Sequence, residues 1–370
     1  MYLSAKIRNK PRANDIDSFC KRGSRVTVAA DGDTSRPHTG RCKNGILKQF
    51  LTSNCFSRVS LSKTLSVAIK LEGLNPAGSV KLKVALALVS ALEAEGFSPP
   101  NRIIESSSGN LGIALAMVCA NKGYHFTCVT DPNTSRDSLR IMKALGAQVF
   151  EVGEKDKNGG YLLSRINYIK RILDSDPRYV WTNQYANPNN PQVHVETTAV
   201  EIYNKFPDLK FLFIGSGTTG TLTGCAQYFR NRSIKTKIIA VEPTGSITFG
   251  GCPGRRKIPG LGTSRVPEIA CQDAFDDLVY IDEPTTIMMC RRMAMRTGFL
   301  FGGSTGTVLA AVEKFFGSKP ENSIVAISPD FGERYLNTIY NDTWVEQEFP
   351  NLLAVEPKSD AERREFARCS

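Results

Sequence analysis

Apolar and polar residues follow one another along the chain in a pattern that predicts alternating strands and helices from about residue 44 onward. Short runs rich in β-branched and aromatic residues predict buried strands at residues 67–71, 102–105, 124–130, 147–152, 179–181, 211–214, 237–241 and 278–281. Segments with helical spacing of apolar residues lie between them, at 83–95, 111–120, 135–145, 161–173, 193–206, from 220 to about 232, at 285–297 and at 302–315. This succession predicts an α/β fold with parallel sheets flanked by helices.

The two ends of the chain lack such a pattern. Residues 1–43 mix Arg, Lys, Ser, Asp and Gly without a sustained period, and we expect a disordered basic extension there. Its four aspartates, Asp15, Asp17, Asp31 and Asp33, argue against a transit peptide, and no signal-peptide core is present. Residues 347–370 are interpreted as a polar tail.

The net charge of the chain does not alter the fold prediction and bears only on possible partners. The net charge is +11, but residues 1–50 hold eleven Lys and Arg against four Asp and Glu, so +7 of the excess lies there. The globular part therefore offers no strongly basic face, and we expect neither nucleic acid nor membrane as a partner. No apolar run approaches the roughly 18–20 residues that span a bilayer. Small-molecule substrates fit this composition best.

The cysteines and histidines do not form a metal-binding pattern. Ten cysteines are scattered without a C-x-x-C pair, and the three histidines are far apart in the sequence. A zinc site is therefore not expected, and a reduced, cytoplasmic protein is. Cys119 and Cys128 fall within apolar helix and strand patterns, where buried thiols are common.

Four loops of small residues each connect a strand or extended run to the start of a helix. They lie at residues 75–81, 106–110, 215–221 and 302–306. In parallel α/β sheets such loops gather at the carboxyl ends of the strands, where ligands bind. Lys81 ends the first loop after Ser79, which we expect to be the N-cap of the following helix. The helix dipole disfavours a cation at that place, and a lysine that reacts with a carbonyl must be neutral.

The third loop allows two interpretations. Its sequence Gly-Ser-Gly-Thr-Thr-Gly at residues 215–220 follows a strand and has Glu242 about twenty residues further on, which matches the dinucleotide-binding fingerprint. The hydroxyls of Ser216, Thr218, Thr219 and Thr221 instead suit a phosphate monoester, which has three oxygens to bind. The loop alone does not decide between them.

All four loops, taken in order, resemble the fold-type II pyridoxal-phosphate enzymes of the cysteine synthase family. Gln184, Asn187 and the segment His-Val-Glu-Thr-Thr at 194–198 are also similar to that family, and the resemblance covers roughly residues 45–345. It implies pyridoxal 5'-phosphate as cofactor, a homodimer and two lobes. The large, cofactor-binding lobe would comprise residues 44–74 and 186–346, and the smaller, mobile lobe residues 75–185.

Further segments resemble one branch of this family, the N-(2-amino-2-carboxyethyl)-L-glutamate synthases. They are residues 105–112, 159–162, 256–262, 263–268, 335–336 and 340–344. The branch joins O-phospho-L-serine and L-glutamate with release of phosphate, a step towards 2,3-diaminopropionate in siderophore and peptide-antibiotic biosynthesis. One segment departs from the family pattern: residues 50–56 are poorly matched to a stretch that helps to line the site in relatives.

The resemblance also implies a role for individual residues. Lys81 would hold the cofactor as a Schiff base and move the Cα proton of the substrate. Asn110 would bind the cofactor's 3-hydroxyl, and Ser304 would face its pyridine nitrogen. The phosphate would lie against Gly217, Thr218, Thr219, Gly220 and Thr221. The substrate carboxylate would be held by Ser107, Ser108, Gly109 and Gln184.

The second substrate remains open between alternatives. A cysteine-synthase-like enzyme would use a sulfur nucleophile after the same first half-reaction, and a dinucleotide-binding oxidoreductase is a third possibility based on residues 215–220. Glutamate, unlike sulfide, needs a counter-charge for its side-chain carboxylate. Arg265, with Arg256 and Lys257 nearby in the irregular stretch 242–266, is the candidate, since arginine binds carboxylates through two parallel hydrogen bonds. The alternative is that these three residues form an exposed basic loop without such a role.

Overall fold

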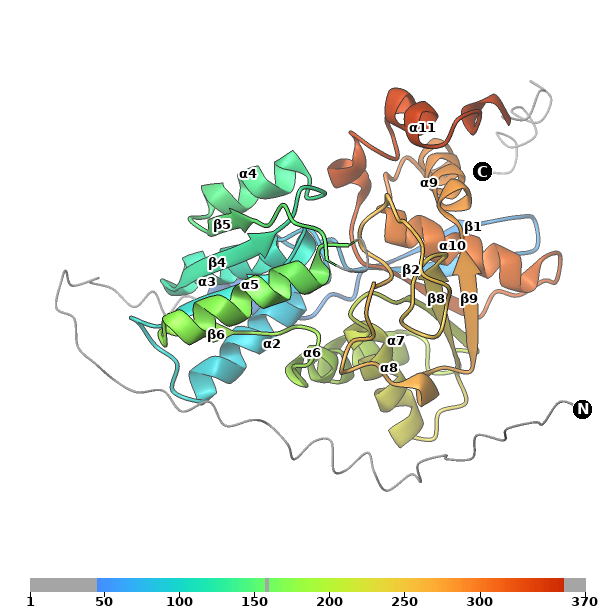
Figure 1. The fold of residues 1–370 in the computed structure, drawn as a ribbon. Helices are drawn as coiled ribbons and strands as arrows, with labels where there is room; N and C mark the ends of the chain where they lie inside the picture. Colours follow the sequence, from blue (N-terminus) through green and yellow to red (C-terminus); the bar gives the residue numbers. More distant parts are fainter. Residues whose placement is uncertain (1–44, 157–159, 356–370) are drawn as a thin grey trace, which may run out of the picture. The chain divides into compact units, whose positions relative to one another are not determined.

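The protein, described here from a computed structural model, is placed over residues 45–156 and 160–355. The expected basic extension and residues 356–370 of the expected tail lie outside these residues. The described chain contains a six-stranded and a four-stranded sheet with helices around them (Figure 1). All pairings except one are parallel, so the predicted α/β class is confirmed.

The six-stranded sheet combines segments from both ends of the described chain. In spatial order its strands are β1 (Phe56–Ser60), β2 (Ser66–Leu71), β10 (Ile324–Ser328), β7 (Phe211–Gly215), β8 (Lys237–Pro243) and β9 (Asp277–Ile281). Only β1 pairs antiparallel with its neighbour. The helices around it are α7 (Ala199–Lys205), α8 (Gly220–Asn231), α9 (Glu283–Thr297) and α10 (Gly303–Phe316).

Both faces of this sheet are buried, and each has its own core. Phe213 and Ile239 pack with residues of α9 and α10, whereas their neighbours Leu212 and Ile238 pack with residues of α7 and α8. Because successive side chains of a strand point to opposite faces, a strand covered on both sides reads as a continuous apolar run. This is why the strand predictions succeeded along β7 and β8.

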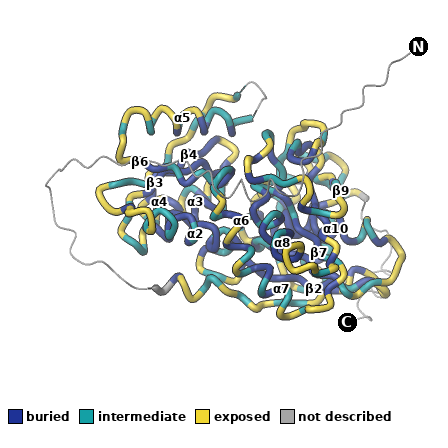
Figure 2. The backbone as a smooth tube through the Cα atoms, turned by 90° about the horizontal axis from the view of Figure 1, so that it is seen from below, coloured by how far each residue is buried: buried dark blue, intermediate teal, exposed yellow. Residues whose placement is uncertain are grey.

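The four-stranded sheet is entirely parallel. Its spatial order is β5 (Gln148–Glu151), β4 (His125–Thr130), β3 (Arg102–Ser106) and β6 (Tyr179–Trp181). On one face lie α2 (Lys81–Ala94), α3 (Asn110–Lys122) and α4 (Arg136–Ala144), and on the other α5 (Leu162–Ser175). Figure 2 shows the strands β3, β4 and β7 largely buried and exposed residues along the outer side of α5.

The sequence predictions did not include the edge strand β1 or the late helix α11 (Asp342–Glu348), and three further differences lie closer to the predicted loops. Strand β10, which we did not predict, lies in the middle of the larger sheet between β2 and β7. The expected helix 193–206 is longer and composite, with α6 (Asn189–Val193), a π-helical turn His194–Thr198 and then α7. Ser79 is not the N-cap of α2: Val80 occupies that position, and the buried Ser79 hydroxyl has no hydrogen-bond partner.

The described chain also contains short helical segments outside the two sheets. They are the 3-10 turns Gly45–Phe50, Gln272–Ala274, Gly332–Tyr335 and Leu353–Val355, and the helix α11 (Asp342–Glu348). Phe349, Leu352 and Leu353 pack against a small core around Ile339, so the chain remains packed beyond residue 347.

The two sheets fall on either side of the predicted lobe division. Strands β3 to β6 lie within residues 75–185 and the other six lie outside that range. Mobility of the smaller lobe stays a prediction. In the part of the chain that is described, no helix is long and apolar enough to cross a membrane.

Candidate active site

Lys81 is the first residue of α2, and its amine points to the loop that follows β7. Lys81 Nζ lies 3.3 Å from Thr218 Oγ1. The same hydroxyl oxygen accepts a hydrogen bond from Asn190 Nδ2 at 3.2 Å, and Asn190 Nδ2 also donates to the backbone oxygen of Gln184 at 2.7 Å. The structure therefore joins three loops that are distant in sequence around one amine.

The amine of Lys81 is easier to deprotonate than an ordinary lysine. Desolvation by the surrounding protein lowers the pKa of Lys81 from 10.5 to about 8, while the nearby carboxylate of Glu105 acts in the opposite direction. We expected the helix dipole to favour a neutral Lys81, and in the structure burial of the amine lowers its pKa. A lysine with this pKa has a substantial neutral, nucleophilic fraction near neutral pH.

Glu105 was missed by sequence reasoning, because an acid that ends an apolar strand reads as an exposed residue. Its carboxylate is buried and accepts four hydrogen bonds, from Ser106 N, Trp181 Nε1, Thr182 Oγ1 and Gln184 N, at 2.8, 3.0, 2.6 and 3.1 Å. Desolvation raises the pKa of Glu105, and these bonds oppose the rise. Glu105 thus anchors the segment that carries Gln184.

The loop between β7 and α8 forms a cup of backbone and hydroxyl groups at the N-terminus of α8. Thr219 has φ of 70°, a left-handed conformation that a threonine rarely adopts. The buried hydroxyls of Ser216 and Thr219 have no hydrogen-bond partner. A Cβ at Gly220 would come within 2.1 Å of Asn190 Oδ1, so the backbone lies against its neighbours as only glycine allows.

A second group of polar side chains in the site consists of Ser304, Asn110 and Asp330. Ser304 is buried in the first turn of α10, and a Cβ at Gly260 would lie 3.3 Å from its hydroxyl. Asn110 donates to Asp330 Oδ2 at 2.7 Å and accepts from the guanidinium of Arg334. Asp330 also accepts from the Tyr335 hydroxyl at 2.9 Å, and burial raises its pKa. Sequence reasoning missed Asp330 because it also missed the preceding strand β10.

The residues expected to hold the substrate carboxylate lie together at the carboxyl end of β3. Ser107 Oγ accepts from the backbone N–H of Gly112 at 2.9 Å and of Gly109 at 3.3 Å, which shapes the turn into α3. Ser108 and Gly109 are half-buried. Gln184 Nε2 donates to the backbone oxygen of Ser106 at 3.0 Å, which places Gln184 beside this turn.

The basic residues considered as counter-charges lie in different surroundings. Arg265 Nη2 pairs with Glu268 Oε2 at 2.6 Å, and its guanidinium lies 5.6 Å from the centre of the Tyr185 ring. Arg256 donates to the backbone oxygen of Gly245, and Lys257 pairs with Glu348. These two are therefore engaged within their own loop or with α11.

A further arginine, Arg165 of α5, was not singled out in the sequence. It is buried and lies 3.3 Å from Asp131 Oδ2, yet its Nε and Nη1 make no hydrogen bond. Burial raises the pKa of Tyr185, and both Arg165 and Arg265 oppose that rise. Two guanidinium groups thus act on the tyrosine that follows Gln184.

Glu242, the acid of the dinucleotide fingerprint, does not present a free carboxylate. It is buried at the end of β8, and its Oε1 accepts from Ser246 Oγ at 3.0 Å. One oxygen of the Glu242 carboxylate is therefore occupied by a side chain of the loop that follows β8. Among the described residues, no group of three or more His, Cys, Asp and Glu side chains could hold a metal ion.

The residues present fit pyridoxal phosphate. The cup at the start of α8 offers hydroxyls without partners and free backbone N–H groups, which suit a phosphate. The amine that lies 3.3 Å from Thr218 Oγ1 suits an aldehyde on the same small molecule. Ser304 and Asn110 provide polar groups for the ring.

Comparison with known proteins agrees with this reading of the site. Residues 54–330 match the family described as pyridoxal-phosphate dependent enzyme. Two relatives are named N-(2-amino-2-carboxyethyl)-L-glutamate synthase. The one from Ralstonia nicotianae is 42% identical over 78% of this chain and 86% of its own length, and the one from Cupriavidus metallidurans is 41% identical over 78% and 88%.

Solved structures of similar fold belong to the same group of enzymes. The crystal structure of an O-ureido-L-serine synthase has a TM-score of 0.72 and 33% identity, covering 87% of this chain and 99% of that one. The O-acetylserine-dependent cystathionine β-synthase of Helicobacter pylori has a TM-score of 0.73 and 29% identity, covering 80% and 98%. The expected fold-type II architecture is thereby confirmed. The chain belongs to the family of pyridoxal-phosphate dependent enzymes, and pyridoxal phosphate is its cofactor.

Proposed function

We propose that this enzyme joins O-phospho-L-serine and L-glutamate by β-replacement and releases N-(2-amino-2-carboxyethyl)-L-glutamate and phosphate. The two named relatives support the reaction. The observation that carries the choice of nucleophile is the position of Arg265, whose guanidinium lies 5.6 Å from the centre of the Tyr185 ring, directly after Gln184. A dicarboxylate such as glutamate needs a counter-charge beyond the groups that hold the first substrate, whereas sulfide needs none.

The site residues named above each have a task in this reaction. Bound pyridoxal phosphate supplies an electron-withdrawing ring that lets a serine-derived substrate lose its Cα proton and its β-substituent. The neutral amine of Lys81 holds the cofactor, accepts the Cα proton and later returns it. The uncharged hydroxyl of Ser304 would lie against the pyridine nitrogen and would leave it unprotonated, which would favour loss of the β-substituent over transamination.

The remaining site residues orient the reactants. Gly217, Thr218, Thr219, Gly220 and Thr221 bind the cofactor's phosphate, and Asn110, held by Asp330, is placed to bind its 3-hydroxyl. Ser107, Ser108, Gly109 and Gln184 hold the substrate carboxylate. Closure of the smaller lobe, residues 75–185, excludes water from the reacting carbon atoms.

The proposal extends to the setting of the enzyme. By the same likeness, it works as a cytoplasmic homodimer, and its product serves as a precursor of 2,3-diaminopropionate for a siderophore or a peptide antibiotic. A cysteine-synthase-like activity is the second candidate, because solved relatives include the O-acetylserine-dependent cystathionine β-synthase of Helicobacter pylori, at 29% identity.

Product analysis distinguishes the two reactions. The purified enzyme is supplied with O-phospho-L-serine together with L-glutamate, sulfide or both, and the products are identified by mass spectrometry. We expect the glutamate adduct, with one phosphate released for each molecule formed, including when sulfide is present. Cysteine as the main product of the mixture would overturn the proposal.

Arg265 is tested with a matched control from the same loop. Loss of a charge-assisted pair costs about 1.5–3 kcal/mol, so Arg265→Ala should lower turnover at low glutamate by roughly ten- to a hundredfold. The single-turnover release of phosphate from O-phospho-L-serine alone should remain normal. Arg256→Ala, whose guanidinium binds Gly245, should leave the dependence on glutamate unchanged. If Arg265→Ala instead slows phosphate release, Arg265 belongs to the O-phospho-L-serine site.

A further inference from the structure

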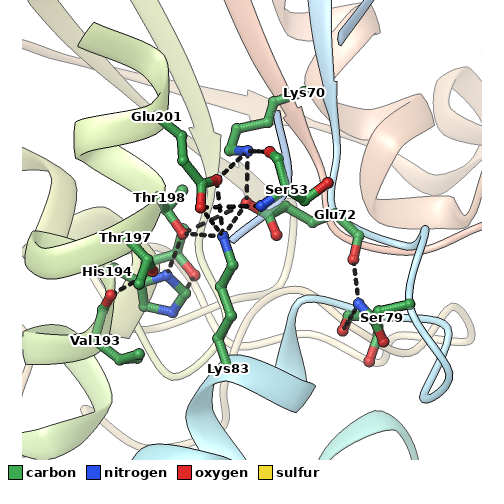
Figure 3. A network of polar contacts seen from close by, with 12 residues as sticks. Ser53, Lys70, Glu72, Ser79, Lys83, Val193, His194, Thr197, Thr198 and Glu201 are labelled. Atoms are coloured by element: carbon green, nitrogen blue, oxygen red, sulfur yellow. Dashed lines mark hydrogen bonds and ion pairs between the residues drawn. The ribbon is translucent and has the colours of Figure 1, made fainter. Parts of the chain in front are cut away.

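Four charged side chains lie buried beside the cofactor cup, and none of them has a task in the reaction proposed above. Lys83 Nζ lies 2.9 Å from Glu72 Oε1 and 3.0 Å from Glu201 Oε2, and Lys70 Nζ lies 3.2 Å and 2.5 Å from the same two atoms. Figure 3 shows the four side chains pointing toward one another. Two lysines and two glutamates balance in charge, which makes burial of such a group tolerable.

Lys83 has a third contact that leads out of this cluster. Its Nζ donates to Thr198 Oγ1 at 3.3 Å. Thr198 Oγ1 lies 3.0 Å from His194 Nδ1, and His194 Nε2 lies 3.2 Å from Thr221 Oγ1. The π-helical turn His194–Thr198 carries both middle members. A continuous row of hydrogen-bonding groups therefore runs from Lys83 to Thr221 in the phosphate cup.

The distances determine which way the donors of this row point. A lysine ammonium has hydrogens only to donate, so Thr198 Oγ1 is its acceptor. The single hydroxyl hydrogen of Thr198 has two acceptors in reach, His194 Nδ1 at 3.0 Å and Glu72 Oε1 at 3.4 Å. The shorter contact is the better hydrogen bond. His194 Nδ1 is then an acceptor, and its hydrogen lies on Nε2 and is donated to Thr221 Oγ1.

His194 must be uncharged for this arrangement. Burial, the largest cause, and the positive charges of Lys83, Lys81 and Lys70 together lower the pKa of His194 from 6.5 to about 3, while Glu72 opposes them. A neutral imidazole carries one ring hydrogen, so the second nitrogen is free to accept. Thr221 receives its hydrogen bond from His194 and keeps its own hydroxyl hydrogen for another acceptor.

We propose that Lys83, Thr198 and His194 are positioning residues that turn the Thr221 hydroxyl into a donor for the cofactor's phosphate, with His194 as the neutral Nε2–H tautomer. The inference rests on the placement of Thr221 in the phosphate cup. In the opposite tautomer, Thr221 would give its hydrogen to His194 and present lone pairs to a dianion. Lys83 of the buried ion cluster therefore orients the hydrogen bonds that run from Thr198 through His194 to Thr221.

Nitrogen NMR of the holoenzyme tests the tautomer directly. The chain has only three histidines, so the signals of ¹⁵N-histidine-labelled enzyme can be assigned with a His194→Gln variant. We expect the shift pattern of a neutral imidazole with its hydrogen on Nε2, unchanged around neutral pH. A hydrogen on Nδ1, or a doubly protonated ring, overturns the proposal.

Neighbouring threonines provide a matched pair of variants. Thr198→Val removes the hydroxyl that links Lys83 to His194, whereas Thr197→Val removes only a hydrogen bond to the backbone oxygen of Val193. A hydrogen bond of this kind corresponds to about a fivefold to tenfold change in an equilibrium. On dialysis of the holoenzyme, Thr198→Val should lose cofactor faster by about that factor, with a shifted ³¹P signal of the bound phosphate. Thr198→Ser should restore both.

The outcomes distinguish a positioning role of Thr198 from a general loss of protein stability and from an effect on catalysis. Equal cofactor loss in Thr197→Val and Thr198→Val, or an unchanged ³¹P signal in Thr198→Val, overturns the proposal. Lys83→Met is not the variant of choice, because it would leave Glu72 and Glu201 with Lys70 alone. None of these measurements uses an amino-acid substrate, so they stay informative whichever nucleophile the enzyme takes.

Discussion

The protonation of Lys81 is the residue property on which the site depends most. Its pKa of about 8 comes from burial, against 10.5 for a free lysine. A lowered lysine pKa means that the unfolded chain binds more protons between about pH 8 and 10.5. The cofactor-free protein should therefore gain stability as the pH rises through that window, since burial of the charged amine no longer opposes folding.

The same property predicts how cofactor attachment depends on pH. The neutral amine is the reactive form, so the rate at which added pyridoxal phosphate reacts with the protein should rise with pH and level off above about 8. The rate is followed by the change in absorbance of the cofactor. A rate that keeps rising to about pH 10.5, the ordinary value of a lysine, would show that burial does not tune this amine.

Ser304 is expected to set the electronic character of the cofactor ring. In a Ser304→Asp variant the new carboxylate would stabilise the protonated form of the pyridine nitrogen and make the ring a stronger electron sink. We expect slower net β-replacement with the cofactor still bound, measured as turnover together with the visible spectrum. Unchanged turnover would mean that another residue faces the nitrogen. Asp330, buried close by, is then the first candidate.

Among the secondary-structure elements, the turn from β7 into α8 is sensitive to added volume. Gly220→Ala places a methyl group 2.1 Å from Asn190 Oδ1, and Asn190 is the residue that holds both Thr218 and the backbone of Gln184. Overpacking of this kind costs about 1–3 kcal/mol. We expect reduced cofactor occupancy and a lowered Tm.

Gly153→Ala is the control for that variant. A Cβ at Gly153 would meet nothing within 4 Å, and its backbone is not left-handed. Its cofactor occupancy and Tm should equal those of the parent enzyme. Full cofactor occupancy in Gly220→Ala would show that the cup tolerates a displaced Asn190.

Strands could be predicted from the sequence where helices cover both of their faces, because a short apolar run then carries the signal. Strands β3, β7 and β8 read as continuous apolar runs because helices cover both faces of a parallel sheet. Strand β10 has a similar composition, but its importance follows only from pairing with β2 and β7, which are far away in sequence. Asp330 follows that strand and was missed with it.

The buried ion cluster could not be predicted either, because Glu201 is distant in sequence from the other members. Lys70 and Lys83 lie in apolar segments and would usually be assigned to the surface. Their partner Glu201 is 118 residues beyond Lys83, and no local pattern connects them. Likewise Arg165 and Glu105 become site residues only when the carboxyl ends of β3 and β4 are brought together.

For the molecule as a whole, the order of the four loops was sufficient to predict the family, whereas contacts between loops required the structure. The described hydrophobic clusters begin at Leu47, and the residues before them lack the apolar content to join a core. A chain that starts at Asn44 should therefore keep its Tm, its cofactor and its activity. Loss of folding on truncation would show that composition is a misleading guide to the first 43 residues.

The central claim is that Lys81 alone carries the pyridoxal phosphate, and chemical trapping tests this most directly. The holoenzyme is reduced with borohydride, which fixes the cofactor to the amine that carries it, and the modified peptide is identified by mass spectrometry. We predict that the label is on Lys81 alone, with none on the neighbouring Lys83, whose amine is engaged by Glu72 and Glu201. A label on Lys83 or on any other lysine, or a protein that reduction leaves unlabelled, would contradict the account.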